Sequence, residues 1–179
     1  MIALAPLNVI KNFGRVYPAV EKYRGSTHPE VYHQVFITDN DRLQRWALKD
    51  TPFFQLFRTL CQYKLFQHIL DGQYTINPVW QSVLSLSDIA DMKTQIYVED
   101  TLVLYCTEFE SYDTLIPLII GSYSRLVING RISWDQAKQF IHEGVKQIRF
   151  NTKTFVLDPT DFDDCIDYVA KHSRGYDYK

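Results

Sequence analysis

Hydrophobic and polar residues along the segment 31–37 fall into two alternating sets, which is the two-residue period of a β-strand: Val31, His33, Val35 and Ile37 against Tyr32, Gln34 and Phe36. The same period appears in residues 94–109 and again in residues 152–157. The pair Glu99-Asp100 could divide the second segment as a hairpin turn, or the segment could form one long bent strand. These segments predict a small sheet.

A longer apolar run covers residues 112–128 and ends at Asn129-Gly130-Arg131. Coiled as a helix, it would be apolar on most of its circumference, so it predicts a core helix that is buried on several sides. Its interruption by Gly121 and Arg125 argues against a membrane span, which needs about 20 apolar residues. The large apolar residues are Leu115, Ile116, Leu118, Ile119, Ile120, Leu126, Val127 and Ile128.

Ser133 and Gln136 fit a capping box, so a second helix is expected to begin at Ser133. Apolar residues then recur at helical spacing as far as Ile148. Because short connections favour adjacent packing, this helix and the preceding apolar run predict an antiparallel helical pair. The apolar stripe consists of Ala137, Phe140, Ile141, Gly144, Val145 and Ile148.

Three further segments carry helix-capping residues. Asp39-Asn40-Asp41 predicts a short helix, and Thr51-Pro52 predicts an aromatic helix through roughly Asp71-Gly72, buried in the core or covered by a partner. Asn77-Pro78 predicts another short helix that carries Trp80, Val83 and Leu84.

The last helix is expected to begin at Thr160 and to turn Phe162, Ile166 and Val169 towards the core. Residues 173–179 lack apolar periodicity, which predicts a frayed tail. Together these elements predict an α+β fold with one compact domain over residues 1–172. Its small, mainly antiparallel sheet would pack against several helices, including the antiparallel pair.

Composition narrows the classes of function. The chain has 19 basic and 21 acidic side chains, whereas a nonspecific nucleic-acid binder is usually basic. Cys61, Cys106 and Cys165 are odd in number and widely spaced, which is typical of reduced thiols in a cytoplasmic protein. The first residues, with Pro6 among them, predict no secretory signal.

The common catalytic motifs are absent from the sequence. There is no GxxxxGK[ST], GxGxxG, GxSxG or HExxH motif, so we expect no cofactor. His28, His33 and His68 could approach a cysteine, but a hydrogen-bonded structural histidine is the commoner case. Catalysis by a cysteine nucleophile with a histidine base remains an alternative, although no sequence pattern favours one of the cysteines.

Carboxylates on both sides of the strand at 102–106 supply the main enzymatic alternative. Strand-borne acids can hold a divalent metal for cleavage of a nucleic acid or another phosphorylated substrate. Two observations argue against such a metal site. The position two residues after Glu108 or Glu110 holds no lysine, and acids at strand ends are commonly just solvated. The alternative metal ligands are Glu99, Asp100, Glu108 and Glu110.

Two surfaces of opposite charge are predicted on the last two helices. Asp161, Asp164 and Asp167 would share the outward face of the last helix, where they could bind a basic partner protein. The helix from Ser133 would carry a basic stripe that could contact phosphate or nucleic acid, although two packed helices with a solvated face explain it better. That stripe consists of Lys138, His142, Lys146 and Arg149.

The sequence therefore favours a small, non-catalytic, cytoplasmic protein-binding protein. An immunity or inhibitor-type accessory protein of a bacterium or phage, acting by steric blocking, would fit its size and mild acidity. A metal-dependent enzyme is the first alternative and a nucleic-acid-binding module is the second. No membrane association is expected, and a homo-oligomer stays open.

Overall fold

The structure is a computed structural model that describes residues 29–49, 52–60, 63, 80–92 and 94–172 of the chain. Its strands are β1 (Glu30–Thr38), β2 (Ser82–Ser85), β3 (Ile96–Cys106), β4 (Ile119–Gly121), β5 (Arg125–Ser133) and β6 (Gln147–Val156). Its helices are α2 (Asp41–Ala47), α3 (Pro52–Leu60), α5 (Leu86–Asp91), α6 (Phe109–Leu115), α7 (Trp134–Gln139) and α8 (Phe162–His172), and a short 3-10 helix, η3 (Pro159–Asp161), precedes α8.

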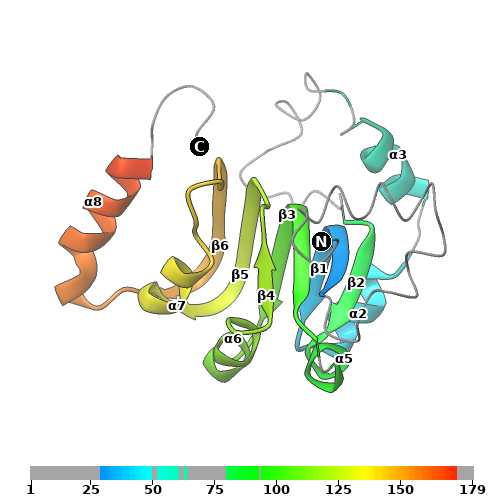
Figure 1. Ribbon diagram of the computed structural model, residues 1–179, viewed down its shortest axis with the longest axis horizontal. Helices are drawn as coiled ribbons and strands as arrows, with labels where there is room; N and C mark the ends of the chain where they lie inside the picture. Colours follow the sequence, from blue (N-terminus) through cyan, green and yellow to red (C-terminus); the bar gives the residue numbers. More distant parts are fainter. Residues whose placement is uncertain (1–28, 50–51, 61–62, 64–79, 93, 173–179) are drawn as a thin grey trace, which may run out of the picture.

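The strands form a six-stranded sheet in the order β2-β1-β3-β5-β6, and β4 also pairs with β3 (Figure 1). All the described strand pairs are parallel. The mainly antiparallel sheet predicted from the sequence is therefore wrong, and the arrangement is of the α/β type. Parallel neighbours need crossover connections, and the short helices between the strands lie in these connections.

The central strands are buried on both faces of the sheet. Consecutive side chains of β1 from Val35 to Ile37 have no exposed surface, and Leu102–Leu104 of β3 are almost as deeply buried. One face packs against α5, α6 and α7 in the larger core. On the other face, Phe36, Val103 and Val127 pack with Ala47 of α2 and with Trp80.

The apolar run at 112–128 is not a core helix. It contains the end of α6, all of β4 and the start of β5. Both strands pair with β3, β4 through Ile96 to Val98 and β5 through Thr101 to Cys106, so they act as one interrupted strand. The prediction failed because a strand buried on both faces is apolar at consecutive positions, as a buried helix is.

The capping box at Ser133 is confirmed, but the helical pair is wrong. Ser133 Oγ accepts from the Gln136 amide at 3.3 Å, and Gln136 Oε1 accepts from the Ser133 amide at 3.2 Å. The helix ends at Gln139 and not near Ile148, and β6 starts at Gln147. Four residues of the predicted stripe are nevertheless buried, three of them after the helix has ended, namely Ala137, Phe140, Ile141 and Val145.

Other predicted elements had mixed outcomes. The strand at 31–37 is confirmed as β1, and the helix after Asp39-Asn40-Asp41 is confirmed as α2 with Asn40 at its N-cap. The segment at 94–109 contains the single strand β3, without a hairpin. The short helix expected around Val83 and Leu84 is wrong, because these residues lie in β2.

Two predictions involve residues that the structure does not describe. The aromatic helix is present as α3, but its predicted continuation to Gly72 lies outside the described residues, apart from Tyr63. The frayed tail at 173–179 also lies outside them. Within the described part of the chain, no helix is long and apolar enough to span a membrane.

Gly130 of β5 is the residue whose backbone the sheet most clearly constrains. Its φ is 101°, and a Cβ at this position would lie 1.8 Å from the carbonyl oxygen of Cys106 in β3. The register between β5 and β6 shifts at the same point. A side chain here would therefore strain β5 and push it away from the central strand.

We predict that Gly130→Ala lowers the free energy of unfolding by at least about 2 kcal/mol, through an unfavourable φ and the collision with β3. Urea denaturation measures the change. Gly144→Ala is the matched control, because its Cβ would meet only the side chain of His142, and we expect a change within about 1 kcal/mol. Equal destabilisation by the two variants would refute this role of Gly130.

Candidate protein-binding surface on the last helix

Helix α8 stands beyond β6, at the end of the sheet opposite β2 (Figure 1). The chain leaves β6 through Asp158 and Pro159, turns through η3 and enters α8 with Asp163 and Asp164 in the first turn. Acidic side chains stabilise this end of a helix because they face its positive partial charge. Thr160, the predicted start of the helix, lies within η3.

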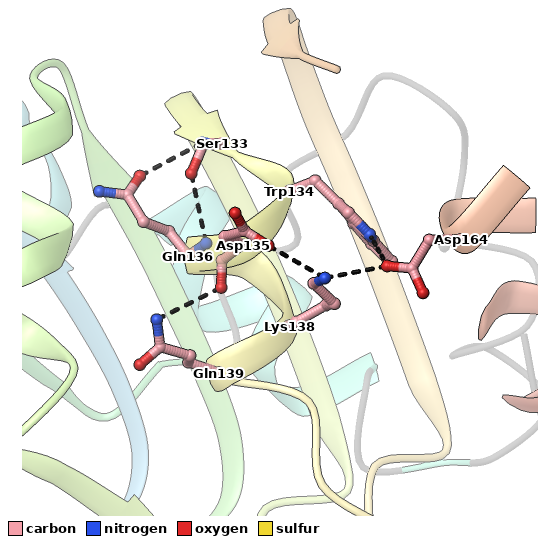
Figure 2. Close-up of polar contacts among 7 residues, drawn as sticks. All are labelled: Ser133, Trp134, Asp135, Gln136, Lys138, Gln139 and Asp164. Carbon is pink, nitrogen blue, oxygen red and sulfur yellow. Dashed lines mark hydrogen bonds and ion pairs between the residues drawn. The ribbon is translucent and has the colours of Figure 1, made fainter. Parts of the chain in front are cut away.

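One side of α8 is attached to α7 through Asp164. Asp164 Oδ2 accepts a hydrogen bond from Trp134 Nε1 at 2.8 Å and from Lys138 Nζ at 2.9 Å (Figure 2). Lys138 also forms an ion pair with Asp135 Oδ1 at 3.0 Å. Figure 2 shows Lys138 between the two carboxylates, so one lysine joins both helices.

Tyr168 adds an aromatic contact to this attachment. Its ring meets Trp134 edge-on at a centroid distance of 5.4 Å, and its hydroxyl donates to the carbonyl of Ile141 at 3.3 Å. Cys165 and Tyr168 of α8 also pack against the larger core. The inward side of α8 is therefore formed by Asp164, Cys165 and Tyr168.

At this attachment, Asp164 and Lys138 each stabilise the charged form of the other. Hydrogen bonds from Lys138 and then Trp134 lower the pKa of Asp164. Hydrogen bonds to Asp164 and then Asp135 raise the pKa of Lys138. Both groups therefore stay charged at neutral pH, although their exposure to solvent screens the attraction.

The outward side of α8 is apolar, which reverses the sequence prediction. Phe162, Ile166 and Val169 were expected to face the core, yet their side chains are 49%, 63% and 51% exposed. Their spacing places them along one face of the helix. Asp163 and Asp167 are also exposed and, at a spacing of four residues, follow one flank of this face.

The acidic face predicted from Asp161, Asp164 and Asp167 is therefore divided. Asp164 points towards α7, Asp161 lies in η3 and is partly buried, and Asp167 remains exposed on α8. Asp163 was missed, as was the exposure of the apolar residues. The helix has two apolar faces, and the less hydrophobic one, with Cys165 and Tyr168, is the face that packs against the core.

The basic residues do not form the predicted stripe on one helix. Lys138 lies in α7 and contacts two aspartates, and His142 lies in the loop that follows. Lys146 precedes β6, and Arg149 lies within that strand, where its Nε donates to Asn151 Oδ1 at 3.1 Å. The predicted stripe required a helix that continues as far as Ile148. Because α7 ends at Gln139, the four residues of the stripe lie in α7, in the loop after α7 and in β6.

The four acids of the enzymatic alternative also lie apart. Glu99 and Asp100 lie within β3, whereas Glu108 and Glu110 follow its carboxyl end at the start of α6. The intervening strand from Thr101 to Cys106 is roughly 20 Å long. In the described ranges, no group of three or more His, Cys, Asp or Glu side chains could hold a metal ion.

From the carboxyl end of β1 the chain continues to β2, and from the carboxyl end of β3 it continues to β4 on the other side. The point between two such neighbouring strands is a common ligand site in open α/β sheets. Asp39 lies there, and its Oδ2 accepts hydrogen bonds from the Thr107 and Glu108 amides and from the Thr107 and Ser111 hydroxyls. Its Oδ1 is buried, so a ligand could not contact that atom without movement. Asp39 therefore holds the start of α6 against β1.

We predict that Asp164→Asn loosens α8 at neutral pH, because the charge that attracts Lys138 is lost. Amide hydrogen exchange in α8, compared at equal pH, should be faster than in the wild type. The pKa of Asp164 is lowered on folding, so its contribution is present above the unfolded-state pKa, near the ordinary value of 3.8, and is lost as pH falls through the folded-state value.

The difference between wild type and Asp164→Asn should therefore disappear below this range. Asp163→Asn is the matched control, because it removes an exposed carboxylate from the same first turn without removing a contact to Lys138, and it should speed exchange less than Asp164→Asn does. A difference that persists unchanged into strong acid would contradict the role of the Asp164 carboxylate.

Comparison with known proteins supplies no further assignment for this surface. No family model matches the chain, and neither curated proteins nor solved structures give a significant match.

Proposed function

We propose that the chain is a small protein-binding protein without catalytic activity of its own, and that it binds a partner through the outer side of α8. We define the docking surface as Phe162, Ile166 and Val169 together with Asp163 and Asp167. The observation that carries the proposal is the exposure of three large apolar side chains along one helix face.

The exposed apolar area would favour association. Single exposed apolar residues are ordinary on a protein surface, whereas a contiguous group with a polar rim is typical of an interaction site. Covering the exposed half of each side chain would contribute on the order of 1 kcal/mol. The flanking aspartates would favour a partner whose apolar surface is bordered by basic residues.

The chemistry of the described thiols also favours binding over catalysis. Cys106 is buried, and this burial raises the pKa of its thiol. Burial is also the largest cause of the raised pKa of Cys165. A nucleophilic cysteine needs a substantial thiolate fraction, which these environments disfavour.

Steric blocking is the mechanism that we propose within this class. A helix that stands outside the sheet could cover a functional surface of its partner without any chemical step. We propose an immunity or inhibitor-type accessory protein of a bacterium or phage, working in the cytoplasm. The mild net acidity of −2 and the negative flank of α8 support a partner with a basic surface.

Affinity capture from the native host tests this proposal with wild type and Ile166→Asp. The substitution places a charge in the middle of the apolar face, and we expect recovery of the bound partner to fall at least about tenfold. Leu56→Asp is the matched control, because it introduces the same charge at an exposed leucine of α3. Equal recovery by wild type and Ile166→Asp would rule out the docking surface.

A further inference from the structure

The outer side of α2 carries a surface of the opposite charge to the docking surface. Arg42 and Arg45 of α2 are exposed and lie on one face at a spacing of three residues, and Lys49, which follows the end of the helix, is also exposed. Trp46 and Leu48 lie beside them and are 37% and 58% exposed. We call these five residues the α2 surface.

The two surfaces match in chemistry. Residues 41–49 contain three basic side chains and one acidic side chain, Asp41, which gives a net charge of +2. Helix α8 contains three aspartates and one lysine, Lys171, which gives −2 with His172 neutral. Each surface combines exposed apolar side chains with its excess charge, so contact would bury apolar area and pair opposite charges.

These surfaces lie at opposite ends of the sheet. Helix α2 packs against β1 and β2, whereas α8 stands beyond β6 (Figure 1). A contact between them therefore has to join two molecules. We propose that a second copy of this chain places its α2 surface on the docking surface of the first, so that molecules associate head to tail.

The charges disfavour the symmetric alternative. A dimer that packs α8 against α8 would bring Asp163 and Asp167 of both copies together, and like charges across an interface are repulsive. An anionic membrane would repel the same aspartates. Head-to-tail contacts leave one surface open at each end, so association would continue beyond a dimer unless a ring closes.

This self-association would regulate the docking surface whose function is proposed above. The contact area of two short helices is small compared with the roughly 800 Å² that each partner contributes to a standard interface. The assembly would therefore be weak and would form at high protein concentration. A tighter-binding partner would displace the second copy, because both occupy the outer side of α8.

Sedimentation velocity from low micromolar to near-millimolar protein, at low and high salt, tests the proposal with two charge-reversal variants. The first variant reverses the α2 surface, and the second reverses the flank of α8. Wild type should exceed its monomer mass of 21.1 kDa as concentration rises, and high salt should weaken this growth. The substitutions are Arg42→Glu, Arg45→Glu and Lys49→Glu in the first variant, and Asp163→Lys and Asp167→Lys in the second.

Each variant alone should remain monomeric, because its two surfaces then carry the same sign. An equimolar mixture should associate again, because every α2 surface can then meet an α8 flank of opposite charge. Lys146→Glu is the control at an exposed lysine elsewhere, and it should behave like the wild type. Restored association in the mixture would also show that both variants are folded.

Three results would overturn the self-association proposal. They are a wild type that stays monomeric at every concentration, variants that associate alone as the wild type does, and a mixture that does not associate. A monomeric wild type whose partner capture still depends on Ile166 would refute self-association alone. Self-association without any dependence of partner capture on Ile166 would instead refute the proposed function.

Discussion

The pairing of β3 on both of its edges is the constraint on which the rest of the structure depends. Buried backbone amides and carbonyls need hydrogen-bond partners, and β1 supplies them on one side while β4 and β5 supply them on the other. Because the pairs are parallel, the connections between neighbouring strands have to run over a face of the sheet. The short helices of these connections then cover the faces that the central strands leave apolar.

This constraint also explains where polar side chains are used inside the fold. Asp39 at the end of β1 binds the backbone and side chains that begin α6, directly after β3. Gln136 completes the capping box of α7 and also donates to the Phe109 carbonyl and to Asp113, both in α6. Polar contacts therefore fix the helices that leave the carboxyl ends of neighbouring strands.

Elements that depend on neighbouring residues could be predicted from the sequence, whereas the pairing of distant segments could not. The cap at Ser133, the helix after Asn40 and the strand β1 depend on neighbouring residues, and all three are confirmed. Whether Leu126–Ile128 form a helix or a strand depends on β3 and β6, which lie far away in the sequence. Likewise, no local sequence pattern shows that two paired strands run parallel.

The candidate site shows the same limit. The sequence identified α8 as a charged amphipathic helix, but it did not determine which face turns inward. Cys165 and Tyr168 face the core because Trp134 and Lys138 contact the same side of the helix. That contact leaves Phe162 and Ile166 outside and turns Asp164, one of the predicted partner-binding residues, towards α7.

The attachment of α8 connects the fold to its proposed function. Trp134 and Lys138 belong to α7, which begins directly after β5, so the central sheet positions the residues that hold α8. The helix is thereby fixed on one side and exposed on the other. A partner would meet a surface that is already ordered, which reduces the entropic cost of binding.

Site-specific photo-crosslinking in the native host tests most directly whether the outer side of α8 binds another protein. A photoreactive amino acid would replace Ile166 on α8 or, in a parallel sample, Leu56 on α3. We expect a covalent adduct with a different protein from position 166 and none from position 56. The absence of any such adduct from position 166, or an equal adduct from position 56, would contradict the binding of a partner through α8.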